Sequence, residues 1–247
     1  MICTNKHSFD IARSGYCNLL QPQDRRSKEP GDSRDAVAAR RQFLDAGHGA
    51  HFVTPMIEMT DGAQRILDVG CGEGHHLDAL RVATNAEAHG VDISTPAIDL
   101  AARRYRDCFF VIANADRFVP YADASFDLIT SITSRLNASE FRRVVAAGGR
   151  LLIALPGPDD LIELRAAILG EGKVIDRVDR TLETFRGGFE LLRNERVRVT
   201  AQLDRDAIEQ VMTSSYRGLR TRERERLAEI GAMQVTLARD LLLFRAI

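Results

Sequence analysis

The sequence predicts an α/β protein built on a seven-stranded, doubly wound, mostly parallel sheet, with a small N-terminal appendage. From residue 61 onward, short aliphatic or β-branched runs alternate with helical patterns, which is typical of βαβ units and a parallel sheet. Two long strand-like runs near the C-terminus favour an antiparallel partner at one end of that sheet.

Length, composition and charge restrict the class of protein. The 247 residues are 45% hydrophobic and 28% charged, as in soluble globular proteins. The apolar runs are too short to cross a bilayer and the N-terminus lacks a signal peptide, so we expect a cytoplasmic protein with no membrane partner. The irregular spacing of four cysteines predicts free thiols. A net charge of −1 gives no global attraction to a polyanion.

The first sixty residues differ from the rest. Met1 to Asp32 shows turn signals without sustained periodicity. Ser33 then caps a helix that continues to about Ala46, and a second helix covers Phe52 to Met59. We therefore divide the chain into an appendage, residues 1–60, and a main domain, residues 61–247.

The main domain alternates predicted strands and helices. The strands lie near Arg65–Val69, Ala88–Val91, Phe109–Ala113, Phe126–Ser131, Gly149–Leu155, Phe189–Leu203 and Met233–Ala246. Helices begin near His75, Thr95, Ala138, Asp159, Asp204 and Thr221. Pro96 suits a first helical turn, and Gly148-Gly149 predicts a tight turn before a buried strand.

The strongest local signal is the turn Asp68-Val69-Gly70-Cys71-Gly72-Glu73-Gly74, which joins a buried strand to a helix. Glycine at three alternating positions allows a sharp turn and lets a ligand approach the main-chain amides. At a helix N-terminus these amides suit the carboxylate of a methionine moiety, and Asp68 and Glu73 can meet its ammonium group. The turn therefore predicts a site for S-adenosylmethionine.

A dinucleotide site is the alternative to this interpretation. Its G-x-G-x-x-G/A pattern requires Gly or Ala where His75 stands, whereas the spacing here is G-x-G-x-G. Asp92 ends the second strand, where a carboxylate can accept from both ribose hydroxyls while Ile93 covers the adenine. A nicotinamide enzyme would use this acid in the same way, so Asp92 alone does not discriminate.

The segment after the third strand supplies candidates for the adenine side. Ala113 to Asp116 and Val119 to Asp127 resemble the stretch that many methyltransferases write as G-D-A-x-x-L-P-F-x-D-x-S-F-D. Asn114 or Asp116 can bond the adenine amine, and Ala115 occupies the usual acidic position. A plain turn residue is the alternative for each.

Other segments resemble one family, the bacterial guanine-N1 methyltransferases of large-subunit ribosomal RNA, including its macrolide-resistance branch. The matching stretches are His7 to Leu20, Asp24 to Asp32, Arg40 to His48, Leu155 to Leu164 and Val211 to Thr213. The resemblance implies a Rossmann-like class I methyltransferase domain, an N-terminal zinc module that recognises RNA, and a homodimer. We add His48, Ser131 and Asp160 to the candidate cofactor site, and Asp160 stands where the family usually has His.

Zinc is not expected from the residues present. The family holds its zinc with an early C-x-x-C and a later C-x-x-x-H, of which only Cys3 and His7 occur here. Two ligands cannot make a closed tetrahedral site, so the sequence predicts no metal site.

We assign the contacts with the methyl acceptor to Thr133, Ser134 and Arg135, which lie in the loop that faces the methyl group in this fold. The family commonly has Ile-Tyr-Ala-Pro there, which puts the substrate contacts in question, although Arg135 can polarise a carbonyl such as guanine O6.

Three functions stay open: methylation of guanine N1 in ribosomal RNA, methylation of a small molecule, and a degenerate scaffold without catalysis. The retained family segments favour RNA, whereas the near-neutral charge and the missing C-x-x-C favour a small molecule.

Overall fold

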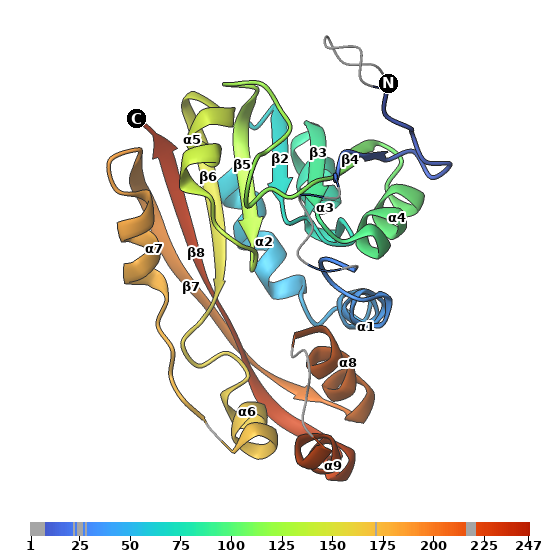
Figure 1. Cartoon of the computed structure of the whole chain (residues 1–247). Coiled ribbons are helices and arrows are strands. Elements are labelled where there is room, and N and C mark those ends of the chain that lie inside the picture. The colour runs from blue at the N-terminus through green and yellow to red at the C-terminus, as the bar shows by residue number, and fades with distance from the viewer. Residues whose placement is uncertain (1–7, 22, 24–26, 28, 171, 216–220) are drawn as a thin grey trace.

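The computed structural model describes residues 8–21, 23, 27, 29–170, 172–215 and 221–247. These residues form one eight-stranded sheet in the order β1-β4-β3-β2-β5-β6-β8-β7 (Figure 1). The strands are β1 Cys17–Asn18, β2 Arg65–Val69, β3 Glu87–Asp92, β4 Cys108–Ile112, β5 Phe126–Ile132, β6 Val145–Pro156, β7 Phe189–Leu203 and β8 Met233–Ala246. The helices are α1 Arg34–Asp45, α2 Ala50–Thr60, α3 His75–Thr84, α4 Thr95–Arg104, α5 Ala138–Val144, α6 Ile162–Leu169, α7 Val178–Phe185, α8 Arg205–Ser215 and α9 Thr221–Glu229.

All seven predicted strands are present, and β8 pairs antiparallel with both β6 and β7 as expected. The eighth strand, β1, comes from the N-terminal segment and pairs in parallel with β4, where Leu19 N also donates to Ile112 O at 2.9 Å. This pairing covers the edge that β4 would otherwise expose. Two residues are too short for a strand pattern, so the sequence did not indicate β1.

Two boundaries and one helix differ from the prediction. Helix α6 begins at Ile162 rather than near Asp159, because Leu161 adopts a left-handed conformation with φ of 54° just before it. Strand β6 begins at Val145, so that Gly148 and Gly149 lie inside the strand and not before it. Helix α7 was not predicted at all.

Helices cover both faces of the sheet. One buried cluster joins α1, α2, α3, α4, α6 and α8 to the sheet, and a second joins α5 and α7 to the opposite face. Phe43 of α1 and Phe52 and Met56 of α2 lie in the first cluster with Ile66 of β2 and Leu128 of β5. The helices before residue 61 therefore pack on the same core as the main sheet.

The order of the strands positions the functional site. From β2 the chain passes to β3 and then β4 on one side of the sheet, and it returns to β5 and β6 on the other side of β2. In open α/β sheets, ligands bind outside the carboxyl ends of the strands at the point where the order reverses. The carboxyl ends of β2 and β5 are therefore the expected place for a ligand.

The two long strands β7 and β8 extend beyond the parallel strands, and α6, α8 and α9 gather around their far end (Figure 1). Within the described part of the chain, no helix combines the length and the apolar character needed to span a bilayer.

Candidate cofactor and acceptor site

A cavity of about 700 Å³ lies at the carboxyl ends of β2, β3, β4 and β5. It brings together most of the residues predicted from the sequence. Its lining includes Asp68, Gly70, Cys71, Gly72, Glu73, Asp92, Ile93, Asn114, Ala115, Asp116, Thr133, Ser134 and Arg135. The cavity stands at the reversal point of the strand order, as the topology requires.

The glycine turn has the conformation that its composition predicts. Gly70, Gly72 and Gly74 have φ values of 79°, 55° and 81°, in the left-handed region that favours glycine. A Cβ on Gly70 would lie 1.8 Å from Ser134 Oγ, so the loop after β5 rests directly on this turn. Glycine at position 70 is therefore required by both backbone conformation and space.

Four amides of this turn donate hydrogen bonds within the protein. Gly70 N and Cys71 N donate to Val91 O at 2.7 and 3.1 Å, and Gly74 N donates to Cys71 O at 3.0 Å. Gly72 N donates to Asp92 Oδ2 at 3.0 Å. These bonds fasten the turn to the end of β3, so an anionic group in the cavity needs another partner.

Arg40 of α1 lies against the turn, since a Cβ on Gly72 would lie 3.1 Å from its Nη2. Its Nε pairs with Glu73 Oε2 at 2.7 Å, and its Nη1 pairs with Asp32 Oδ2 at 2.6 Å. Burial opposes the charged form, but the two carboxylates raise the pKa of Arg40 above its ordinary value. Sequence reasoning missed this residue because its partner Glu73 is 33 positions away.

Asp68 is buried at the floor of the cavity, with 2% of its surface exposed. Burial raises its pKa to about 7, although Oδ1 accepts a hydrogen bond from Thr130 Oγ1 at 2.8 Å that favours the charged form. The carboxyl group is therefore close to half ionised at neutral pH. A ligand cation beside it would favour ionisation.

Asp92 is held in place at the end of β3 by two main-chain amides. Its Oδ1 accepts from Ser94 N at 2.8 Å, and its Oδ2 accepts from Gly72 N at 3.0 Å. Burial raises the pKa of Asp92, while these two hydrogen bonds favour its charged form. Each carboxylate oxygen keeps a further acceptor site for a hydroxyl group.

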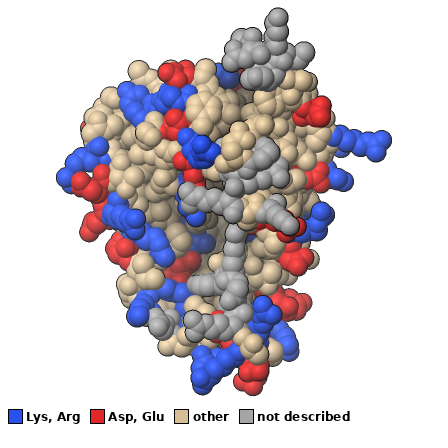
Figure 2. Space-filling view, in the orientation of Figure 1, with Lys and Arg blue, Asp and Glu red and all other residues tan. Residues whose placement is uncertain are grey.

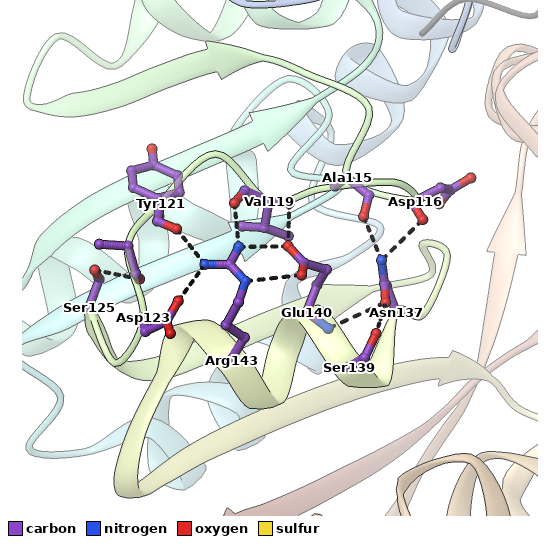
Figure 3. A network of polar contacts seen from close by, with 11 residues as sticks. Ala115, Asp116, Val119, Tyr121, Asp123, Ser125, Asn137, Ser139, Glu140 and Arg143 are labelled. Carbon is purple, nitrogen blue, oxygen red and sulfur yellow. Dashed lines mark hydrogen bonds and ion pairs between the residues drawn. The ribbon is translucent and has the colours of Figure 1, made fainter. Parts of the chain in front are cut away.

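The loop after β4 is fixed by side chains from the start and body of α5. Asn137 Nδ2 donates to Ala115 O and Asp116 O, both at 3.1 Å. Arg143 donates to Val119 O and Tyr121 O, both at 2.7 Å, and Figure 3 shows both side chains directed toward the loop. Asn137 and Arg143 are positioning residues that the sequence alone did not reveal.

The loop after β5 carries local strain. Thr133 has a φ of 51°, which is costly for a β-branched residue, and its amide donates to Ala154 O at 2.8 Å. Arg135 is 79% exposed and pairs with Asp116 at 3.4 Å. All three residues line the cavity, with Ser134 half-buried and Thr133 and Arg135 exposed.

Four of the predicted cofactor residues do not line this cavity. Gly74 begins α3 beneath the turn, and His48 stacks on Phe43 with ring centroids 4.6 Å apart. Ser131 is fully buried, and no described group bonds its hydroxyl. Asp160 accepts from Ala238 N at 2.9 Å and pairs with Arg239 at 2.6 Å.

Asp160 lines a second cavity of about 470 Å³ that adjoins the first. The two cavities share Asp32, Arg40, His76, Ile132 and Thr133. Burial lowers the pKa of His76 to about 3, with help from His75, Arg239 and Arg40, so its imidazole is neutral at physiological pH. The sequence gave no indication of this cavity, because its walls come from α1, α2, α6, α8 and the ends of β6 and β8.

The segment before α1 closes one side of the first cavity. A Cβ on Gly31 would lie 2.6 Å from Ser94 Cβ, and Ser94 Oγ donates to Asp32 O at 2.8 Å. Cys3 and His7, the two remaining positions of the family's zinc site, lie outside the described residues. Over the ranges that are described, no group of three or more His, Cys, Asp or Glu side chains is placed to hold a metal ion.

Comparison with known proteins identifies the chain. A model described as "Methyltransferase domain" matches residues 66–152, and a zinc-ribbon model described as "RlmA, N-terminal" matches residues 1–28. The structure of a SAM-dependent methyltransferase from Thiobacillus denitrificans, in complex with S-adenosyl-L-homocysteine, aligns with a TM-score of 0.52. It is 16% identical and covers 79% of this chain and 90% of its own, a likeness that shows the fold. The protein is thus an S-adenosylmethionine-dependent methyltransferase with a Rossmann-like domain.

The particular family follows from a longer match. The Streptomyces fradiae protein named 23S rRNA (guanine(748)-N(1))-methyltransferase is 35% identical over 252 residues, covering 96% of this chain and 87% of that relative. The chain belongs to this 23S rRNA (guanine-N1)-methyltransferase family. A demethylmenaquinone methyltransferase from Thermotoga maritima is 33% identical, but over only 36% of this chain and 39% of its own.

Proposed function

We propose that this enzyme transfers a methyl group from S-adenosylmethionine to N1 of a guanine in 23S ribosomal RNA. The observation that supports ribosomal RNA as the substrate is the length of the match to the Streptomyces fradiae relative. This match spans 96% of this chain and includes the N-terminal segment. The match to the small-molecule enzyme is confined to about a third of the chain. RNA is therefore favoured over a small-molecule acceptor.

The residues of the first cavity fit the cofactor. The carboxylate of Asp92 would accept from the ribose hydroxyls, and Ile93 with Asn114 to Asp116 would surround the adenine. Asp68 would meet the ammonium group, and Arg40, rather than the engaged turn amides, would meet the carboxylate. When bound, the cofactor supplies a methyl group on a sulfonium that leaves as a thioether.

This chain's own contribution to the reaction is positioning and proton removal. In-line displacement from an activated leaving group needs little covalent help, so holding the acceptor in line supplies most of the rate. Guanine N1 carries a proton that must leave. The junction of the two cavities offers the carboxylate of Asp32 as a proton acceptor, whereas His76, with its pKa lowered to about 3, is too weak a base for this step.

On the face drawn in Figure 2, the described residues form no continuous basic surface that would hold RNA by charge alone. Basic and acidic side chains are interspersed over it (Figure 2), in keeping with 34 Lys plus Arg against 35 Asp plus Glu. Recognition of RNA would then depend on local contacts and on extrusion of the target base into a cavity.

The deciding experiment measures transfer of tritiated methyl from the cofactor. Ribosomal RNA that lacks the modification and a small-molecule extract are offered as acceptors in parallel. We expect label in one guanine of 23S rRNA, located by primer extension because N1 methylation blocks pairing. Label in the extract alone would refute the RNA assignment. Calorimetric titration with the cofactor checks that the enzyme is loaded.

We also propose that the protein acts as a homodimer in the cytoplasm. The family resemblance supports the dimer, and β7 forms an edge of the sheet with Leu191 and Leu192 40% and 44% exposed. Sedimentation velocity at micromolar concentration would give the mass of one or two chains of 27.5 kDa. A monomer at that concentration would contradict the dimer.

A further inference from the structure

The second cavity combines apolar walls with charged side chains, a mixture that suits a flat heteroaromatic ring with polar atoms on its edge. Phe43, Phe52, Met56 and Leu161 contribute apolar walls, and Arg165 contributes a guanidinium. Its volume of about 470 Å³ lies within the range of small-ligand pockets, about 300 to 1,000 Å³, and is large enough for a nucleoside. It opens onto the first cavity beside Thr133.

Arg165 differs from Arg40, Arg177 and Arg239, the other arginines that line this cavity, because it alone among these four is buried. The side chain lies on α6 and the residue is only 9% exposed. Its Nη2 donates to Pro158 O at 3.3 Å, but its buried Nε has no hydrogen-bond partner, and no acidic side chain of the described residues pairs with it. By contrast, Arg40 pairs with two carboxylates and Arg239 pairs with Asp160.

A buried guanidinium with unmatched donors is costly unless a ligand completes its hydrogen bonds. Because Arg165 lines the cavity and its terminal nitrogens are not enclosed in the way that Nε is, two acceptor atoms placed there would pair with Nη1 and Nη2. Two of the other arginines that line the cavity, Arg40 and Arg239, are already paired with carboxylates, so a neutral group that offers two acceptors suits Arg165 beside the apolar walls. The O6 and N7 edge of guanine offers two acceptors in the spacing that arginine contacts as a pair.

We propose that Arg165 is a specificity-determining residue that binds the O6 and N7 edge of the acceptor guanine in the second cavity. This inference rests on the proposed function, because it takes the acceptor to be a guanine base. Adenine presents a donor at the position of O6, so the same contact would reject it. The base would enter from the cofactor side of Thr133, where the two cavities meet.

The test compares Arg165→Gln with Arg226→Gln in the full-length enzyme. Arg226 is the matched control, because its Nη1 donates to Ile168 O of the same helix at 3.0 Å and it lines neither cavity. We expect kcat/KM for ribosomal RNA to fall roughly tenfold to a hundredfold in Arg165→Gln. Arg226→Gln should keep the wild-type value, and cofactor affinity should be unchanged in both. Wild-type kinetics in Arg165→Gln would overturn the proposal.

A modified substrate separates base contact from a merely structural role. An RNA hairpin is made with 7-deazaguanosine at the methylated position, which removes N7 and leaves N1 intact. The wild-type enzyme should methylate it several-fold more slowly than the guanosine hairpin, whereas Arg165→Gln should not discriminate. Equal rates on both hairpins by the wild-type enzyme would overturn the proposal even if the variant failed to fold. Absence of methylation of any RNA would instead refute the proposed function.

Discussion

Asp68 offers a direct test of the electrostatics of the cofactor cavity through the change Asp68→Asn. The substitution keeps the oxygen that accepts from Thr130 Oγ1 and removes the buried charge. In the folded protein the pKa rises from 3.8 to about 7. Each pKa unit corresponds to about 1.4 kcal/mol, so ionised Asp68 reduces the free energy of unfolding by about 4 kcal/mol.

The sign of this effect sets the pH window. Between pH 3.8 and about 7 the folded state holds a proton on Asp68 that the unfolded state has released. The free energy of unfolding of the wild type therefore falls, relative to that of Asp68→Asn, as the pH rises through this window, and the difference is complete above pH 7. Denaturant unfolding at pH 4, 6 and 8 measures it, with Asp61→Asn at an exposed position as the control.

The same substitution should weaken cofactor binding, because the ammonium group loses its anionic partner. In the wild type the cofactor affinity should rise about tenfold from pH 6 to pH 8 as Asp68 ionises, and calorimetry should show no such rise in Asp68→Asn. A stability difference between the two proteins that does not vary with pH would refute the assignment of a raised pKa to Asp68.

Three further substitutions probe the frame of the site. Asp92→Ala should weaken cofactor binding by about 1 to 3 kcal/mol, seen by calorimetry, because it removes the acceptor for the ribose hydroxyls; unchanged affinity would show that the ribose lies elsewhere. Gly70→Ala should abolish cofactor binding, because its Cβ would meet Ser134, whereas Gly62→Ala, with a φ of 75° and nothing within 4 Å, should keep it; equal effects would contradict the close approach. Asn137→Ala should lower stability by about 1 kcal/mol in thermal unfolding through loss of the α5 cap, and should also weaken cofactor affinity several-fold, a loss absent if the loop after β4 plays no part.

Local patterns predicted those features whose signals lie within a few residues. Phe189–Leu203 and Met233–Ala246 form β7 and β8 with the predicted bounds. The three glycines adopt the left-handed conformations that the sharp turn required. Helix α7 shows that such a signal can be overlooked, since its buried residues Val178, Thr181 and Phe185 follow helical spacing.

The sequence did not predict features that are formed by segments far apart along the chain. Arg40 and Glu73 meet only because α1 packs beside the glycine turn, and no local pattern links them. The second cavity needs α2, α6 and α8 to converge, which depends on the complete topology. The hydrogen bonds from two amides of the turn to Val91 were not predicted, because Val91 lies on β3, which is not adjacent to the turn in sequence.

The position of Arg40 has a consequence for how substrate and cofactor communicate. One guanidinium joins the segment before α1, through Asp32, to the glycine turn, through Glu73. If binding of RNA strengthens these two ion pairs and thereby raises the affinity for the cofactor, thermodynamic reciprocity requires that binding of the cofactor raise the affinity for RNA by the same factor. An RNA that binds the N-terminal segment would in this way help the enzyme to retain its methyl donor until the acceptor base enters the site.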